Sequence, residues 1–166
     1  MQSAFVAMKL PVKSQVEGKR HLTVYSEAAI DFNTVNIQVT YFKHHRILGI
    51  QLTSWHTAGE DRIMRLISFL NYVNSMFMDI GCFCLQPGKG KITLRAGYPV
   101  VEGGVEKNQL AQTLYRVLSH GYRGFQLITR AVFEGMPFEE VISDELKRMG
   151  SSETAPPCAH IKDSVN

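Results

Sequence analysis

The change in hydrophobic period near residue 57 is the feature that most limits what this chain can fold into. Over residues 34–41, apolar and polar side chains alternate, which is typical of a strand with one buried face. Over residues 63–77, apolar side chains recur every three or four positions, which is typical of an amphipathic helix. The chain therefore combines half-buried strands with amphipathic helices, and both need a shared core to cover their apolar faces.

Three strand patterns precede this helix. They cover residues 21–25, 34–41 and 46–54. The polar residues 43–45 between the second and third patterns predict a hairpin turn. We therefore expect the first three strands to form an antiparallel meander.

The helix is predicted over residues 58–77, and a second hairpin is predicted after it. Thr57 and Glu60 have the spacing of a capping box, in which each side chain bonds an otherwise unpaired backbone amide. Strand patterns over residues 81–86 and 91–96 flank a turn that contains one proline and two glycines.

The last third of the chain predicts helices. Apolar residues recur at helical spacing in residues 110–118 and again in residues 125–133, and Gly121 is expected to interrupt them. Pro137 favours the start of a further short helix. The expected fold class is α+β: an antiparallel β-sheet, made of a three-stranded meander and a β-hairpin, with helices packed on one face.

The length of 166 residues suits a single domain. Residues 1–19 are expected to be an N-terminal arm or an edge strand, and residues 20–149 a single α+β domain. Residues 150–166 are polar, contain Pro156 and Pro157, and lack an apolar period, so we expect a flexible C-terminal tail.

Charge and hydropathy disfavour two classes of partner. The net charge is +3, and the densest basic cluster is residues 43–46, which makes nucleic-acid binding an unfavoured hypothesis. No apolar run approaches the roughly 20 residues of a membrane-spanning helix, and residues 1–10 lack a signal-peptide pattern. We therefore expect a cytoplasmic protein.

The sequence shows no recognisable catalytic or metal-binding signature. Cys82 and Cys84 are one residue apart and no second pair exists, so packing cysteines are favoured over a four-ligand zinc site. Residues 88–91 are glycine-rich and basic but lack the pattern of a phosphate loop. Ser119 and His120 are neighbours in sequence and do not face each other on a helix. We expect neither an enzyme nor a cofactor.

The order of elements and several residues resemble the YbjN-like proteins and the wider type III secretion chaperone-like fold. The segments that carry the resemblance are residues 66–74, which place Asn71 and Asn74 in a leucine-rich helix, residues 82–85, 91–96 and 125–140. The resemblance implies a non-enzymatic, often dimeric protein that acts through protein–protein contact. For YbjN-like members it implies a sensory or regulatory role, and for the secretion chaperones the binding of an extended partner segment.

The helix over residues 58–77 also carries the candidate functional residues. Some of its apolar side chains lie outside the side that faces the core, and exposed apolar residues of this kind often mark an interface. The candidate interface residues are Trp55, Met64, Tyr72, Met76 and Phe77. Asn71 and Asn74 form a second candidate, a polar spot, although hydrogen bonds to strand ends or loops are the favoured explanation.

The leading hypothesis is a protein-interaction module, chaperone-like or regulatory, that binds a protein segment and forms a homodimer. The first alternative is a small-molecule sensor, with Asn71, Asn74, Arg95 and Tyr98 supplying polar groups to an apolar pocket. The second alternative is an enzyme of unrecognised type, whose site is assembled in space.

Overall fold

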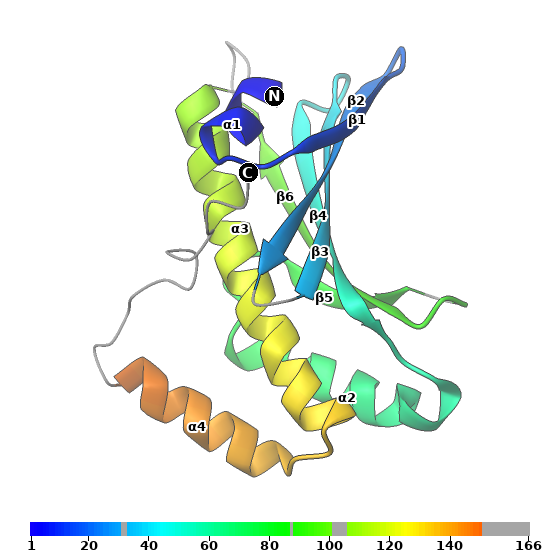
Figure 1. Cartoon of the computed structure of the whole chain (residues 1–166), viewed down its shortest axis with the longest axis vertical. Coiled ribbons are helices and arrows are strands. Elements are labelled where there is room, and N and C mark those ends of the chain that lie inside the picture. The colour runs from blue at the N-terminus through cyan, green and yellow to red at the C-terminus, as the bar shows by residue number, and fades with distance from the viewer. Residues whose placement is uncertain (31–32, 87, 101–105, 151–166) are drawn as a thin grey trace, which may run out of the picture.

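The computed structural model describes residues 1–30, 33–86, 88–100 and 106–150. It is an α+β structure with a six-stranded antiparallel sheet (Figure 1). The strands are β1 (Val12–Glu17), β2 (His21–Ile30), β3 (Asn33–Phe42), β4 (Ile47–Thr57), β5 (Cys82–Gln86) and β6 (Lys91–Pro99). The helical elements are α1 (Gln2–Ala7), α2 (Glu60–Met76), α3 (Lys107–Ile128), the π-helical segment η1 (Thr129–Phe133) and α4 (Phe138–Gly150).

The strand order is β1-β2-β3-β4-β6-β5, so consecutive strands are neighbours except where α2 intervenes. The first four strands form a meander, and the chain then leaves the sheet through α2. It returns as the β5–β6 hairpin, in which β6 pairs with β4 and β5 becomes an edge. The expected antiparallel sheet with its two hairpin units is confirmed, with β1 as an additional strand.

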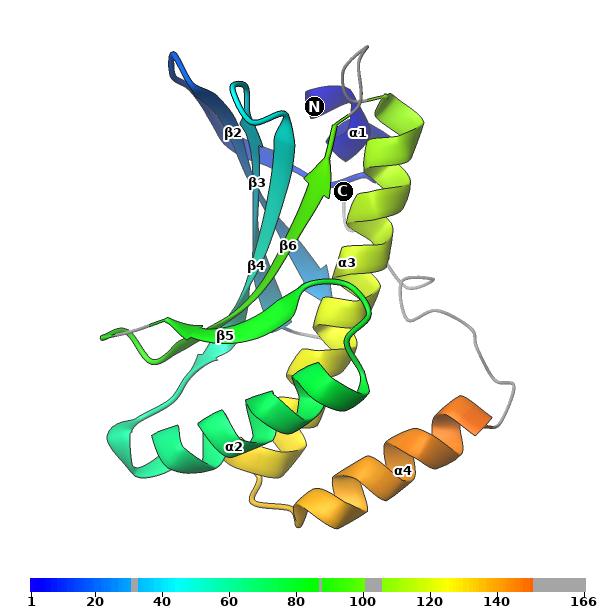
Figure 2. The ribbon, with the colours of Figure 1, turned by 180° about the vertical axis from the view of Figure 1, so that it is seen from behind.

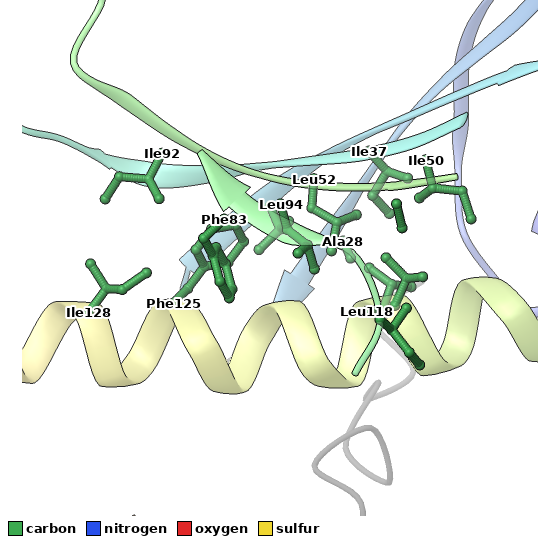
Figure 3. Packing of buried hydrophobic residues seen from close by; sticks show 14 of the residues in the cluster. Ala28, Ile37, Ile50, Leu52, Phe83, Ile92, Leu94, Leu118, Phe125 and Ile128 are labelled. Carbon is green, nitrogen blue, oxygen red and sulfur yellow. The ribbon is translucent and has the colours of Figure 1, made fainter. Parts of the chain in front are cut away.

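The helices lie on one side of the sheet, and the opposite face carries none of the described helices (Figures 1 and 2). The long helix α3 crosses the covered face, while α2 and α4 lie beyond one end of the sheet. Alternate strand residues such as Ile37, Ile50 and Leu94 point toward α3, where Phe125 and Leu118 meet them (Figure 3). All five are at most 3% exposed, so the core lies between the sheet and α3.

Gly121 does not interrupt α3, contrary to the sequence prediction. An added Cβ at Gly121 would lie 2.5 Å from Leu52 Cδ1, and one at Gly124 would lie 2.2 Å from Phe83 Cζ. Both glycines are therefore contact points at which the helix backbone approaches the sheet. The cost of glycine in a helix is about 1 kcal/mol, and close packing offsets it.

Residues 1–19 contain both a helix and an edge strand. In α1, Ala4 and Phe5 are fully buried, and Leu10 follows them into the core. β1 begins directly after Pro11 and pairs with β2 along one edge of the sheet. The apolar spacing of so short a helix is too brief to be recognised as a period.

The predicted capping box at Thr57 and Glu60 is wrong. β4 extends through an irregular stretch between Thr53 and Thr57, and Thr57 pairs with Lys91 in the sheet. The N-cap of α2 is Gly59, without a side-chain cap bond. Glu60 still lies in the first turn, where the helix dipole favours a negative charge.

The final helix, α4, begins at Phe138, directly after Pro137. The flexible tail was expected over residues 150–166. Gly150 is the last residue of α4, and residues 151–166 lie outside the described part of the chain. No helix within the described ranges has the length and apolar character needed to cross a bilayer.

Candidate functional site

The helix α2 has one buried face and one largely exposed face. Leu66, Phe69, Leu70 and Val73 are buried. The sequence predicted most of this stripe but placed Ile67 in it, and Ile67 is exposed. Three of the candidate interface residues lie outside the buried face, with exposed fractions of 73% for Met64, 53% for Met76 and 39% for Tyr72.

Trp55 does not share this exposed surface, whereas Phe77 lines the same hollow as Met76. Trp55 lies within the irregular stretch of β4 and packs against Tyr122 and Phe125, with ring centroids 6.2 and 5.7 Å away. Phe77 is half-buried at the end of α2. The five candidate residues therefore do not form one patch, because the β4 irregularity turns Trp55 toward the helices.

Asn74 connects α2 to the edge strand β5. Its Oδ1 accepts a hydrogen bond from the Phe83 N–H at 2.7 Å, and its Nδ2 donates to the Phe83 carbonyl at 2.9 Å. This is the structural role that the sequence analysis favoured for the pair. Asn71 is exposed on the outer side of α2, so the two asparagines do not form one polar spot.

The helix α4 is amphipathic, but its apolar side is only partly covered. Val141 and Ile142 are buried, whereas Leu146 is 49% and Met149 is 51% exposed. Near its start, the Phe138 ring packs on Phe69 of α2 with centroids 4.7 Å apart. The first half of α4 is therefore packed against the protein body, and its last half leaves apolar side chains accessible.

Charged side chains hold α4 to α3 and to η1. Glu145 is buried between Arg123 and Arg148, and both guanidinium groups donate hydrogen bonds to it. Arg130 Nη2 donates to Asp144 at 2.6 Å. Burial opposes the charge of Glu145, but the two arginines outweigh it and hold the pKa of Glu145 below its ordinary value.

Two hollows lie along the line between α2 and α4, and we call them together the α2–α4 groove. The first has a volume of about 500 Å³ and lies between Tyr72 and α4. Its other lining residues are Phe138, Glu139, Ile142, Ser143, Leu146 and Lys147. The second, of about 370 Å³, lies at the C-terminal ends of both helices, where Met76 and Met149 contribute, with Leu127 of α3.

A third hollow, of about 550 Å³, lies on the α3 side of α4 and is called the Trp55 pocket here. Trp55, His56, Arg123 and Gln126 are among its lining residues. The His56 ring stacks on Phe133 with centroids 4.2 Å apart. Burial is the main cause that lowers the pKa of His56, so the imidazole is favoured in its neutral form.

Asp79 has a partner that the sequence did not reveal. His120 Nδ1 lies 3.4 Å from Asp79 Oδ1, beside the second hollow of the groove. Ser75 lines the same hollow, but its hydroxyl donates to the Tyr72 carbonyl at 2.9 Å. In the part of the chain that the structure describes, no three His, Cys, Asp or Glu side chains are grouped to hold a metal ion.

Neither Leu146 nor Met149 was selected from the sequence as a candidate interface residue. A signal was available, because Met149 follows Leu146 at helical spacing and extends the apolar side of α4 to its last turn. The sequence does not predict where α2 lies relative to α4. In the structure, α2 covers only the first part of the apolar side of α4.

The fold and groove define an α+β protein with one helix-covered sheet face and an apolar groove between two helices. No protein-family model matches this chain, and a search of curated proteins gives no significant match. The resemblance to YbjN-like proteins therefore stays a prediction.

Proposed function

We propose that this protein is a non-enzymatic interaction module that binds an amphipathic helical segment of a partner protein in the α2–α4 groove. The observation that carries the proposal is the pairing of two half-exposed apolar helix faces along one groove. Tyr72 and Met76 contribute from α2, and Leu146 and Met149 contribute from α4. An apolar helix placed between them would complete a packing arrangement that α2 and α4 leave open.

The chemistry of the groove suits a helix of mixed polarity. The first hollow is mainly apolar, and Glu139 and Lys147 of α4 offer one charge of each sign there. The second hollow combines apolar side chains with the charged or polar side chains of Asp79, His120 and Arg123. Methionines on such surfaces adapt to partner side chains because the thioether chain is flexible and polarisable. A partner helix with apolar residues at spacings of three and four, and charges beside them, would match these features.

Strand addition at the β5 edge is less favoured than helix binding. An added strand needs the outward backbone groups of the edge. The N–H and carbonyl of Phe83 are already bonded to Asn74. At the other edge, Lys13 and Glu17 of β1 form ion pairs with Glu27 and Lys43, and charged edge residues discourage pairing with a further strand.

A display library of peptides tests this proposal. The library holds peptides of about 18 residues, or five helical turns, with apolar positions in helical and in alternating patterns. We expect peptides selected on the full-length protein to carry the helical pattern. Their binding should be lost with Leu146→Glu and retained with Phe42→Glu, a matched change on the helix-free sheet face. Selection of alternating patterns, or equal loss with both variants, would overturn the proposal.

The expected homodimer is a separate proposal. The helix-free sheet face is the surface on which to test it, because it carries the exposed residues Val16, Tyr25, Phe42 and Ile47. Sedimentation of wild-type protein and of Phe42→Glu would show whether a dimer forms there. A monomer at high concentration in both samples would contradict it. The regulatory or chaperone-like role, the lack of enzymatic activity and the cytoplasmic location stay predictions.

The Trp55 pocket supports a second candidate function, the binding of a small molecule. The observation that favours it is the convergence of Trp55 and His56 with polar groups of Arg123 and Gln126 around one hollow. The four residues named from the sequence for such a site do not line this pocket: Asn71, Asn74, Arg95 and Tyr98. A thermal-shift screen with aromatic carboxylates, compared between wild type and Gln126→Ala, would test it. Equal shifts for both proteins would contradict binding in this pocket.

A further inference from the structure

Cys82 and Cys84 form an accessible pair of thiols on the edge strand β5. Their side chains point to the helix-free face of the sheet, because Phe83 between them points into the core. Cys82 is exposed and Cys84 is half-buried, and both are free. Their Sγ atoms lie 3.6 Å apart. The sequence analysis favoured packing cysteines, whereas the structure places these thiols outside the hydrophobic core.

The backbone between the two cysteines is fixed on two sides. The Phe83 side chain is 3% exposed and packs on Phe125, with ring centroids 5.3 Å apart. The Phe83 backbone N–H and carbonyl are both bonded to Asn74. The two thiols are therefore carried by a backbone segment that cannot move without breaking core contacts.

Closure of the pair into a disulfide is unfavourable in this setting. Alternate residues of an extended strand have Cα atoms about 6.6 Å apart. That is near the upper end of the usual disulfide range of about 4.4–6.8 Å. Shortening the Cα separation would require β5 to bend at Phe83, which is held by Asn74 and Phe125.

The same spacing suits a shared metal ion. Two thiolates about 2.3 Å from a tetrahedral ion lie about 3.8 Å apart, close to the observed separation of 3.6 Å. Thiolates are soft ligands that select Cu(I) and Zn(II). We propose that Cys82 and Cys84 form a two-thiolate site for a thiophilic d¹⁰ metal ion at the sheet edge.

The surroundings agree with a site that is open to solvent and needs no third protein ligand. Within the described residues, no third His, Cys, Asp or Glu joins the pair. Water would complete the shell of Zn(II). Two-coordinate Cu(I) prefers a nearly linear arrangement of its ligands, so the two sulfur atoms would have to move further apart than 3.6 Å to bind it alone. Arg95 lies opposite Cys82 in β6.

Metal binding at this pair must release the thiol protons. Burial and the neighbouring Cys82 raise the pKa of Cys84, against the effect of Arg95. The ion has to displace protons from sulfur, so its affinity should increase as the pH rises.

The test uses the full-length protein with Cys158→Ser as the background, so that only Cys82 and Cys84 remain as thiols. Cu(I), under anaerobic conditions, and Zn(II) are each titrated against a chromophoric competing chelator. We expect one ion per chain. Cys82→Ser or Cys84→Ser should each lower the affinity by about tenfold or more, since even second-shell changes cost about 10–100-fold. Gln86→Ser, on the same face of β5, is the matched control and should leave the affinity unchanged.

Binding of Cu(I) alone would support the site and assign it to an ion that needs two ligands. Binding of Zn(II) alone would also support it, with water as the remaining ligands. Equal affinity in the Cys82→Ser/Cys84→Ser double variant, or no binding above that variant for either ion, would overturn the proposal. Both thiols are accessible, so circular dichroism should show that all variants fold.

Discussion

The two C-terminal helices α3 and α4 are both amphipathic, yet only one of them buries its apolar side. In α3, Leu114, Val117 and Phe125 are at most 1% exposed because the sheet covers them along most of the helix. In α4, the burial of apolar side chains ends after Ile142, and Leu146 and Met149 remain half-exposed. The difference lies in what stands opposite each helix: a continuous sheet for α3, and the separate helix α2 for α4 (Figure 2).

This difference separates apolar residues that hold the fold from apolar residues available to a partner. An amphipathic pattern identifies the apolar side of a helix but not the surface that covers it. Substitutions along α3 should therefore reduce stability, whereas substitutions along the last turns of α4 should reduce binding.

The largest expected effect comes from truncating the α3 core. Phe125→Ala should reduce the free energy of unfolding by about 3–5 kcal/mol, because a buried aromatic ring leaves a cavity. Leu146→Ala is the comparison on α4, and as a surface change it should stay within about 0.5 kcal/mol. Urea denaturation of both variants would measure this. A similar loss for both would show that α4 belongs to the core.

The second effect tests the close approach of α3 to the sheet. Gly124→Ala should cost about 1–3 kcal/mol through overpacking, because the new Cβ would overlap the Phe83 ring. Gly150→Ala at the end of α4 is the control, since its added Cβ meets nothing within 4 Å. Thermal denaturation would compare the two. A stabilised Gly124→Ala would mean that helix propensity outweighs the contact.

The third effect concerns the bond between α2 and β5. Asn74→Ala removes both hydrogen bonds to Phe83 and should cost about 1–2 kcal/mol. Asn71→Ala, one turn earlier and exposed, should change stability by less than about 0.5 kcal/mol. Hydrogen exchange of the Phe83 amide should accelerate only in the Asn74 variant. Equal exchange rates in both variants would contradict the role of Asn74.

The smallest effect should appear only in acid. Glu145 has a lowered pKa in the folded state, so the unfolded state binds its proton more readily. Its contribution to stability is present above the ordinary glutamate pKa of about 4.3 and is lost as the pH falls through the folded value. Stability measured between about pH 6 and pH 3 should therefore decrease more in wild type than in Glu145→Gln. Parallel decreases would show that the two arginines do not stabilise the charge.

Much of the fold followed from local periodicity. The alternating pattern of β3 and the helical stripe of α2 predicted both elements and the faces that they bury. The failures have long-range causes. Gly121 was expected to interrupt the helix because glycine is a poor helix former. Its true role is to make room for Leu52 and Leu94, and these strand residues are distant in sequence, so no local pattern reveals the contact.

The candidate site was predicted only in part. The sequence identified Tyr72 and Met76 as residues outside the core stripe of α2, and both are exposed. It could not place Leu146 and Met149 beside them, because the packing of α4 depends on Phe69, Arg123 and Arg130 elsewhere in the chain. Trp55 was misplaced because no local signal marks the irregular stretch of β4.

Methionine footprinting in the presence of a selected helical peptide tests the central claim most directly. Met76 and Met149 belong to the α2–α4 groove, whereas Met64 is exposed on the outer side of α2 and serves as an internal control. Oxidation of accessible methionine to the sulfoxide reports their burial. We expect the peptide to protect Met76 and Met149 and to leave Met64 reactive. Protection of Met64 alone, or unchanged oxidation of all three with peptide bound, would contradict the groove as the binding surface.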